Sequence, residues 1–309
     1  MSVLVTGASG FVGSWLTKAL ANDGHRVVAQ MRRPPSTLFK KLGLDAQPLV
    51  EVVIEHDIAE VARTCRPETL FHLAGMSQVG QAQENPLLAF ETNARQTWQL
   101  LEAVRNMPTS PRTVVASTDA LYGETGNTPA TEAHPLNALG PYETSKLMAD
   151  VAARAYAQFG LPVVVARLGN VYGYGDENHA RIVPGTLEAI RNARAPRLRG
   201  GGRAVRSLLH IDDCIAALRL LAEHAAEPGL RGEAFNVSGE PAMTTRAIAR
   251  LTLDVFGRED IEPEISDDAP AETSQRFSSS ARLRETLGWR QKISMKGGLL
   301  RIKKEMEAE

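Results

Sequence analysis

The chain has 309 residues, of which 43% are hydrophobic, and its 35 Lys and Arg against 36 Asp and Glu leave a formal net charge of −1. This length suits one large α/β domain, or a large domain with a small one. The balanced charge excludes a general electrostatic attraction to nucleic acid or to an anionic membrane.

The first segment, MSVLVTGASG, enters a strand-like pattern at once, without a basic leader or a cleavable apolar segment. No run of 18 or more apolar residues comes after it. We therefore expect a cytoplasmic protein without a membrane span.

Short apolar runs alternate with longer helical patterns over the first half of the chain. The runs have the composition of parallel strands buried on both faces, and they cover residues 2–6, 26–31, 49–54, 69–74, 112–117 and 162–167. Helical periodicity lies between them, over 11–23, 88–106 and 142–160. This alternation predicts an α/β fold, a Rossmann-type doubly wound parallel sheet with right-handed crossovers.

The pattern changes beyond about residue 170. Helical stretches near 181–193, 211–226, 244–256 and 293–306 are separated by Gly/Pro-rich loops and brief strand candidates. We interpret residues 1–169 as a dinucleotide-binding domain. Residues 170–309 then form a smaller C-terminal substrate-binding lobe, interleaved with the first domain.

Three glycines, Gly7, Gly10 and Gly13, lie where the first strand turns into the first helix. Such a turn lets backbone N–H groups approach a pyrophosphate at a helix N-terminus, whose dipole favours anions. Glycines alone could mark an ordinary turn. Their position after a strand and before a helix favours dinucleotide binding.

The end of the second expected strand bears on the choice of cofactor. NAD sites use an Asp or Glu there for the ribose hydroxyls, but the sequence VVAQMRRPP has no carboxylate and continues with Arg32 and Arg33. A guanidinium suits a 2′-phosphate, so NADP(H) is favoured and NAD(H) is possible. The alternative is two solvated arginines that open a loop.

Tyr142 and Lys146 share one face of the helix predicted over 142–160, because they are four residues apart. A phenol with a pKa near 10 is a poor acid–base group at neutral pH, and a neighbouring ammonium lowers that pKa. Upstream, Ser117, Thr118 and Asp119 end a strand, at the sheet edge where open α/β folds bind ligands. Together these features predict an active site.

With these residues, the sequence resembles the extended short-chain dehydrogenase/reductase family that acts on nucleotide sugars. The motifs that carry the resemblance are spread in order along nearly the whole chain: TGASGFVG (6–13), Asp57-Ile58, FHLAG (71–75), Thr92-Asn93, STDALYGE (117–124), TEAHPLNALGPYETSK (131–146), RLGNVYGYG (167–175), RSLLHIDD (206–213), FNVSG (235–239) and LGW (287–289).

The resemblance assigns roles to residues of this chain. Tyr142 would be the acid/base, Lys146 would bind the nicotinamide ribose and lower the tyrosine pKa, and Thr118 would orient the substrate oxygen. Asp57 would meet the adenine. Asn170 and Arg206 would hold the phosphates of the sugar nucleotide, a role for which a fixed cation is also physically suited. The cofactor-binding positions would be Gly7, Gly10, Phe11, Val12, Gly13, Arg32, Arg33, Asp57, Ile58, Leu73, Ala74, Gly75, Tyr142 and Lys146.

Members of this family share hydride transfer at a sugar carbon but differ in the chemistry coupled to it. The 4,6-dehydratases carry Thr-Asp-Glu after the fifth strand, whereas this chain has Thr118-Asp119-Ala120, with the acid but not the base. We therefore favour NADPH-linked reduction of a 4-keto-6-deoxy nucleotide sugar, with a layout like the 4-keto-6-deoxymannose reductase branch. A 4-epimerase or an atypical dehydratase that uses Asp119 is the alternative. Ala269-Pro270 stands where reductases and epimerases often have Arg-Pro, which affects the choice of nucleotide.

Two further expectations concern partners and metals. The family commonly dimerises through two helices per subunit, and the segments 88–104 and 142–159 could supply them, so we expect a homodimer. Cys65 and Cys214 lack metal-ligand spacing, and no metal is expected. Outside enzymes, a non-catalytic dinucleotide sensor is possible on this fold, but such sensors typically lose the Tyr or Lys that this chain retains.

Overall fold

The computed structural model describes residues 1–266 and 275–308. The chain divides into two compact units, each made of several segments. The first unit comprises residues 1–121, 138–168 and 215–235, and the second comprises 122–137, 169–214 and 236–309. Residues 215–235 thus belong to the first unit although they come after residue 170. The functional division into 1–169 and 170–309 stays a prediction.

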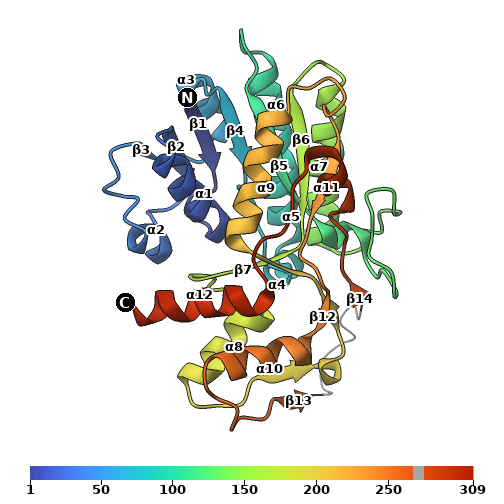
Figure 1. The fold of residues 1–309 in the computed structure, drawn as a ribbon. Helices are drawn as coiled ribbons and strands as arrows, with labels where there is room; N and C mark the ends of the chain where they lie inside the picture. The colour runs from blue at the N-terminus through green and yellow to red at the C-terminus, as the bar shows by residue number, and fades with distance from the viewer. Residues whose placement is uncertain (267–274, 309) are drawn as a thin grey trace. The chain divides into compact units, whose positions relative to one another are not determined.

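A seven-stranded sheet forms the centre of the first unit (Figure 1), with the order β11-β6-β5-β4-β1-β2-β3. The strand pairs β1–β2, β1–β4, β2–β3, β4–β5 and β5–β6 are parallel. The strands are β1 (Ser2–Thr6), β2 (Arg26–Met31), β3 (Val50–Ile54), β4 (Thr69–His72), β5 (Arg112–Thr118), β6 (Val163–Leu168) and β11 (Ala234–Val237). The predicted Rossmann-type α/β fold is confirmed.

Helices cover both faces of this sheet (Figure 1). On one face α3, α6 and α7 pack over a core that contains Leu4, Leu70 and Val163, and α1 and α9 lie on the other face. The helices of this part are α1 (Phe11–Asn22), α2 (Thr37–Lys41), α3 (Ile58–Cys65), α4 (Val79–Glu84), α5 (Pro86–Ala89), the π-helix η1 (Phe90–Arg95), α6 (Gln96–Arg105), the 3₁₀-helix η2 (Asp119–Tyr122), α7 (Pro141–Ala157) and α9 (Ile211–His224).

The segment expected to be helical over residues 88–106 is helical, but it is not an α-helix throughout. It contains the end of α5, the π-helix η1 and α6, which succeed one another without a break. A π turn holds more residues than an α turn, and such turns are frequent at functional sites. Two polar side chains of this π-helix, those of Thr92 and Asn93, are buried.

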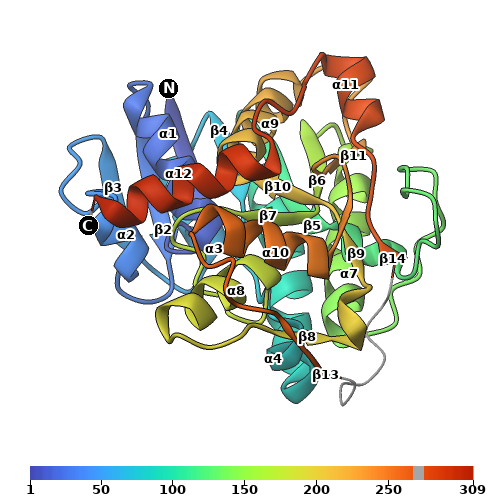
Figure 2. The ribbon, with the colours of Figure 1, turned by 60° about the horizontal axis from the view of Figure 1, so that its bottom comes forward.

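The described part of the second unit contains short strands and four α-helices. Helix α10 lies between α8 and α12 (Figure 2), around a core with Val183, Ile248 and Leu299. Its elements are β7 (Asn170–Tyr172), α8 (Ile182–Arg191), β8 (Arg197–Arg199), the 3₁₀-helix η3 (Gly200–Gly202), β9 (Val205–Arg206), β10 (Leu208–His210), β12 (Met243–Thr244), α10 (Thr245–Val255), β13 (Glu264–Ser266), β14 (Gln275–Arg276), α11 (Ala281–Leu287) and α12 (Met295–Glu307). Within residues 1–266 and 275–308, no helix is long and apolar enough to span a membrane.

Candidate active site

The glycine turn after β1 packs tightly against the backbone that continues from β4. Gly7 has a φ of +70°, and a Cβ added there would lie 2.7 Å from Ala74 Cα. A Cβ at Gly13 would lie 2.3 Å from the carbonyl oxygen of Gly7. Strands β1 and β4 are neighbours where the strand order reverses, which is where open α/β sheets bind ligands. Only residues without side chains fit at these two places.

Helix α1 begins in this glycine turn with backbone N–H groups that no side chain caps. Gly10 is the N-cap in an extended conformation, and no side chain caps the helix. Phe11, Val12 and Gly13 are the first helical residues. Free N–H groups at the positive end of a helix dipole suit an anion, so the geometry fits the pyrophosphate of a dinucleotide.

Arg32 and Arg33 come directly after β2 and are exposed, and neither has an ion-pair partner among the described residues. The last two strand residues before them, Gln30 and Met31, are each 1% exposed. The Gln30 side chain supports the glycine turn, because its Oε1 accepts a hydrogen bond from Gly7 N at 3.3 Å. Its Nε2 donates to the carbonyl oxygen of Glu55 at 2.5 Å. The end of β2 therefore presents guanidinium groups and no carboxylate.

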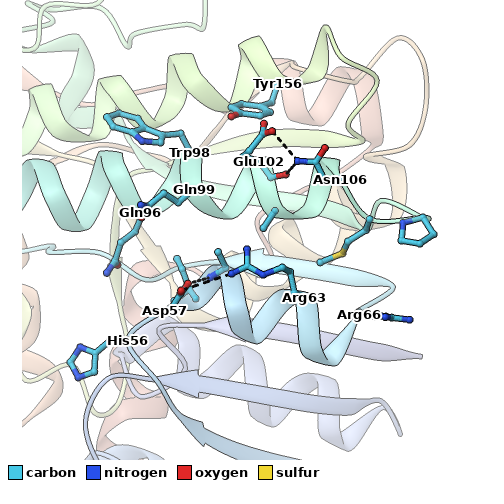
Figure 3. A pocket seen from close by; sticks show the side chains of 15 residues that line it. His56, Asp57, Arg63, Arg66, Gln96, Trp98, Gln99, Glu102, Asn106 and Tyr156 are labelled. Atoms are coloured by element: carbon cyan, nitrogen blue, oxygen red, sulfur yellow. Dashed lines mark hydrogen bonds and ion pairs between the residues drawn. The ribbon is translucent and has the colours of Figure 1, made fainter.

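Asp57 begins α3 as its N-cap. Its Oδ1 accepts hydrogen bonds from the N–H groups of Ala59 and Glu60, both at 3.0 Å. Asp57 and Ile58 line a pocket of about 870 Å³ between α3 and α6, in which Asp57 faces Arg63 (Figure 3). The role of Asp57 and Ile58 at the adenine stays a prediction.

The loop after β4 brings Leu73, Ala74 and Gly75 to the same place as Lys146. A Cβ at Gly75 would lie 2.8 Å from Asn93 Oδ1 and 3.8 Å from Lys146 Nζ. The structure thus brings the glycine turn, this loop and the Lys146 side chain of α7 close together. The assignment of Leu73, Ala74 and Gly75 to the cofactor stays a prediction.

Helix α7 carries Tyr142 and Lys146 in its first two turns, beginning with Pro141 after the N-cap Gly140. Lys146 Nζ donates a hydrogen bond of 2.5 Å to the carbonyl oxygen of Ala116 in β5. Burial lowers the pKa of Lys146 to about 8, although the Asp150 carboxylate acts in the opposite direction. A lysine with this pKa can hold or release a proton near neutral pH, which suits a site of proton transfer.

The carboxyl end of β5 and the residue after it supply the other polar groups. Thr118 and Asp119 are buried, with 8% and 5% of their surfaces exposed. Thr118 Oγ1 accepts a hydrogen bond from Ala120 N at 3.2 Å, so its own hydroxyl proton remains to be donated. Ser117 Oγ is buried without a hydrogen-bond partner among the described residues. β5 also supplies Ala116, the acceptor for Lys146, so this strand and α7 are held together at the site.

Asn170 and Arg206 both lie in the second unit. β7 pairs with β10 so that Asn170 stands opposite Leu208, two residues after Arg206. Arg206 is 5% exposed, and its Nη1 donates to the carbonyl oxygen of Val205 at 2.8 Å. Their role at the substrate phosphates stays a prediction, and Ala269-Pro270 lies outside the described residues.

Sequence reasoning gave no role to three buried polar groups near the site. Asn93 donates through Nδ2 to Ser145 Oγ at 2.8 Å, and Ser145 Oγ donates to the carbonyl oxygen of Tyr142 at 2.7 Å. His72 lies at the end of β4. The motifs FHLAG and Thr92-Asn93 contained two of these residues, but nothing in them specifies the partners. Within residues 1–266 and 275–308, no group of three His, Cys, Asp or Glu side chains could hold a metal.

This arrangement is suited to moving a hydride at a carbon atom and a proton at the oxygen that this carbon bears. Tyr142 and Lys146 lie on α7, Thr118 lies at the end of the neighbouring strand β5, and the glycine turn suits the pyrophosphate of a dinucleotide. General acid–base catalysis by a positioned phenol typically contributes two to about four orders of magnitude in rate. A nicotinamide would supply the hydride chemistry.

Comparison with known proteins agrees with this geometry. Residues 3–238 match the NAD dependent epimerase/dehydratase family. The chain is similar to the UDP-glucose 4-epimerase of Mycolicibacterium smegmatis, with 28% identity over 97% of this chain and 96% of the relative. It is also similar to the dTDP-4-dehydro-6-deoxy-D-allose reductase of Streptomyces bikiniensis, with 31% identity over 83% of this chain and 82% of that protein.

The fold matches a solved structure of UDP-glucuronic acid 4-epimerase from Bacillus cereus in complex with UDP-glucuronic acid and NAD. The TM-score is 0.89, with 23% identity and coverage of 100% of both chains. Further UDP-glucose 4-epimerases and dTDP-glucose 4,6-dehydratases are among the similar proteins. The family match covers the glycine turn, the loop after β4, β5 and α7. The chain therefore belongs to the NAD-dependent epimerase/dehydratase family, the extended short-chain dehydrogenases/reductases that modify nucleotide sugars.

Proposed function

We propose that this enzyme is a nucleotide-sugar 4-epimerase, which inverts the configuration at carbon 4 of the sugar in a nucleoside-diphosphate sugar. The observation that carries the proposal is the end of β5, where Thr118 and Asp119 are buried and Ala120 comes next. Elimination of water requires both an acid and a base, and Ala120 can supply no base. The epimerases among the similar proteins agree with this choice.

Each catalytic residue has one task in this proposal. A bound nicotinamide cofactor would accept the hydride from carbon 4 and return it to the other face. Tyr142 takes the proton of the sugar hydroxyl when the hydride leaves and returns it afterwards, and the Lys146 ammonium stabilises the phenolate. Thr118 donates its remaining proton to the same sugar oxygen, a hydrogen bond that strengthens as charge develops.

The substrate's diphosphate is proposed to bind in the second unit. Arg206 is buried with its guanidinium already oriented by the carbonyl oxygen of Val205, so little rotamer freedom is lost when it meets an anion. Asn170 begins β7, which pairs with β10, the strand that starts two residues after Arg206. A guanidinium that is fixed in place is what bidentate phosphate binding requires.

The second candidate is the NADPH-linked reductase of a 4-keto-6-deoxy nucleotide sugar that the sequence favoured. Its supporting observation is the exposed Arg32–Arg33 pair where an NAD site would have a carboxylate. The similarity to the Streptomyces bikiniensis reductase agrees with it. A reductase consumes its cofactor in each turnover, whereas an epimerase returns the hydride and needs its cofactor only in catalytic amounts.

Purified protein incubated with UDP-, dTDP- and GDP-linked hexoses distinguishes these candidates. We expect the carbon 4 epimer in proton NMR spectra and by chromatography, with no change of mass and no net consumption of NAD(P)H. Stoichiometric NADPH oxidation with a 4-keto-6-deoxy sugar, and no epimer from any hexose, would establish the reductase instead. A product lighter by one water would show a dehydratase.

Replacing both Arg32 and Arg33 with alanine tests the preference for NADP(H). If they hold a 2′-phosphate, NADP+ affinity falls by about ten-fold or more, because a charge-assisted contact is lost, while NAD+ affinity is unchanged. Calorimetry of both cofactors measures this. The control removes two other exposed arginines, Arg191 and Arg194, on the second unit. Equal affinities for NADP+ in the two double variants would contradict the preference.

A homodimer through the segments 88–104 and 142–159 is also proposed. Helix α7 and the segment after it expose Met148, Val151 and Phe159, with 40%, 51% and 70% of their surfaces accessible, and α5 exposes Leu88 at 50%. Exposed apolar side chains gathered on neighbouring helices are typical of a face that a partner covers. Sedimentation velocity measures the mass in solution, and a monomer at all concentrations would contradict the proposal.

A further inference from the structure

His72 is a buried histidine at the end of β4, with 2% of its surface exposed. Burial, assisted by the Lys146 charge, lowers the pKa of His72 to about 3. The imidazole is therefore neutral near pH 7, so one ring nitrogen donates and the other accepts.

The hydrogen bonds around His72 run in one direction only. Thr97 Oγ1 donates its single proton to the carbonyl oxygen of Asn93 at 2.6 Å. The 2.9 Å contact between Thr97 Oγ1 and His72 Nε2 must then have the imidazole as donor. A neutral ring that donates through Nε2 accepts through Nδ1, and Thr6 Oγ1 lies 2.8 Å from Nδ1 as the donor.

Both ends of this chain of hydrogen bonds reach the loop after β4. At one end Thr6 Oγ1 accepts from Ala74 N at 3.2 Å. At the other end, beyond Thr97, the Asn93 amide binds both backbone groups of Met76, accepting from its N–H at 2.7 Å and donating to its carbonyl oxygen at 3.1 Å. Residues 73–76 are thus tied down on both sides of Gly75.

Gly75 is the residue of this loop that comes near Lys146, as the 3.8 Å approach of an added Cβ to Nζ indicates. Asn93 also binds Ser145 Oγ on α7, which is adjacent to Lys146 in sequence. One buried network therefore fixes the loop on one side of the ammonium and the helix that carries it.

We propose that His72, held as its neutral Nε2–H tautomer between Thr6 and Thr97, is a positioning residue that sets loop 73–76 against Lys146. Buried as it is, His72 acts through Ala74, Asn93 and Met76. The inference deepens the proposed function and rests on it for the identity of the reaction. Only a side chain with one donor and one acceptor in this order satisfies both threonines.

A pair of matched threonine variants tests the positioning role. Thr97 and Thr252 are both buried in helices, and both donate from Oγ1 to the carbonyl oxygen four residues earlier, at 2.6 and 2.8 Å. Thr252 lies on α10 in the second unit. Valine keeps the shape of threonine but removes the hydroxyl, so both replacements should lower the melting temperature, Thr97→Val by more because it also leaves the His72 Nε2–H without an acceptor.

Only Thr97→Val should alter catalysis. We expect kcat and NAD(P)+ affinity to fall about ten-fold each, because a buried imidazole N–H loses its acceptor, while KM for the sugar stays within about two-fold. Thr252→Val should keep wild-type values, and Thr97→Ser, which retains the hydroxyl, should recover kcat. Thr97→Val with the kinetics and cofactor affinity of Thr252→Val would overturn the proposal.

The tautomer is measured directly and needs no substrate. Nitrogen-15 spectra of the histidine rings, with His72 assigned among the seven histidines by comparison with His72→Gln, should show Nε2 protonated and Nδ1 bare. A protonated Nδ1 would overturn the proposal even if Thr97→Val fails to fold. If the wild type converts no nucleotide sugar, the proposed function fails, but the ring spectrum and the NAD(P)+ titrations still decide the role of His72.

Discussion

Replacing Tyr142 with phenylalanine is expected to leave a folded protein that binds its cofactor and has lost between about a hundred-fold and ten-thousand-fold of its turnover. The change removes one hydroxyl group and with it the transferable proton. Half-buried Tyr142 lies in the first turn of α7, so the ring can remain where it is. Steady-state kinetics from pH 6 to 10 measure the loss, with thermal melts to show that folding is intact.

Tyr156 supplies the matched control for this substitution. It lies on the same helix, 14 residues later, which at a rise of 1.5 Å per residue is about 21 Å along the axis. Tyr156→Phe removes the same atom from the same helix and should leave kcat unchanged. A well-folded Tyr142→Phe enzyme with near-wild-type turnover would contradict the mechanism, whatever the control does.

The sheet could be predicted well from the sequence because most of its strands are buried on both faces, although β3 is partly exposed. Six of the seven strands lie within two residues of the expected segments, since runs such as Val163–Leu168 contain almost no polar residue. The seventh strand, Ala234–Val237, is four residues long and includes Asn236. A run that short and mixed does not stand out from a loop.

The π-helix could not be predicted from periodicity. A single π turn changes the spacing of apolar residues at one place only. The apolar residues of segment 88–106 therefore still have the average spacing of an α-helix. The turn is marked in the structure by burial of polar groups, because Thr92 and Asn93 face inward where a regular amphipathic helix would place apolar side chains.

Part of the candidate site could be predicted from the sequence, because some of its residues are close together along the chain. Tyr142 and Lys146 are four residues apart, so helix geometry alone brings them together. The partners of His72 lie 66 and 25 residues away along the chain, and only the sheet order, with β4 beside β1, makes His72 and Thr6 neighbours. Contacts of this kind depend on topology, which spacing in the sequence does not report.

Lys146→Met is expected to abolish most of the activity and, in the cofactor-free protein at pH 7, to raise stability. The pKa of Lys146 falls from 10.5 to about 8 on folding because the ammonium is desolvated. At pH 7 folding therefore buries a charge, which lowers the free energy of unfolding, and methionine removes this charge. After allowance for the lost hydrogen bond to Ala116, we expect a gain of about 1–2 kcal/mol in the free energy of unfolding.

The sign of the pH dependence is set by the same shift. Between pH 8 and 10.5 the unfolded chain binds more protons at this lysine than the folded protein does, so the stability of the wild type rises with pH in that window. Lys146→Met has no such group, and its advantage should shrink from pH 8 upward and be gone above about pH 10.5.

Denaturant unfolding of wild type and variant at pH 7, 8, 9, 10 and 11 measures this difference. Lys40→Met is the control, because Lys40 is an exposed lysine of the first unit and its replacement should change stability by the same small amount at every pH. A wild type that is more stable than Lys146→Met at pH 7, or a difference that stays flat to pH 11, would show that the ammonium is not desolvated. The expected result would instead mean that the fold holds Lys146 at a site where its charge lowers stability, as expected of a residue kept for function rather than for folding.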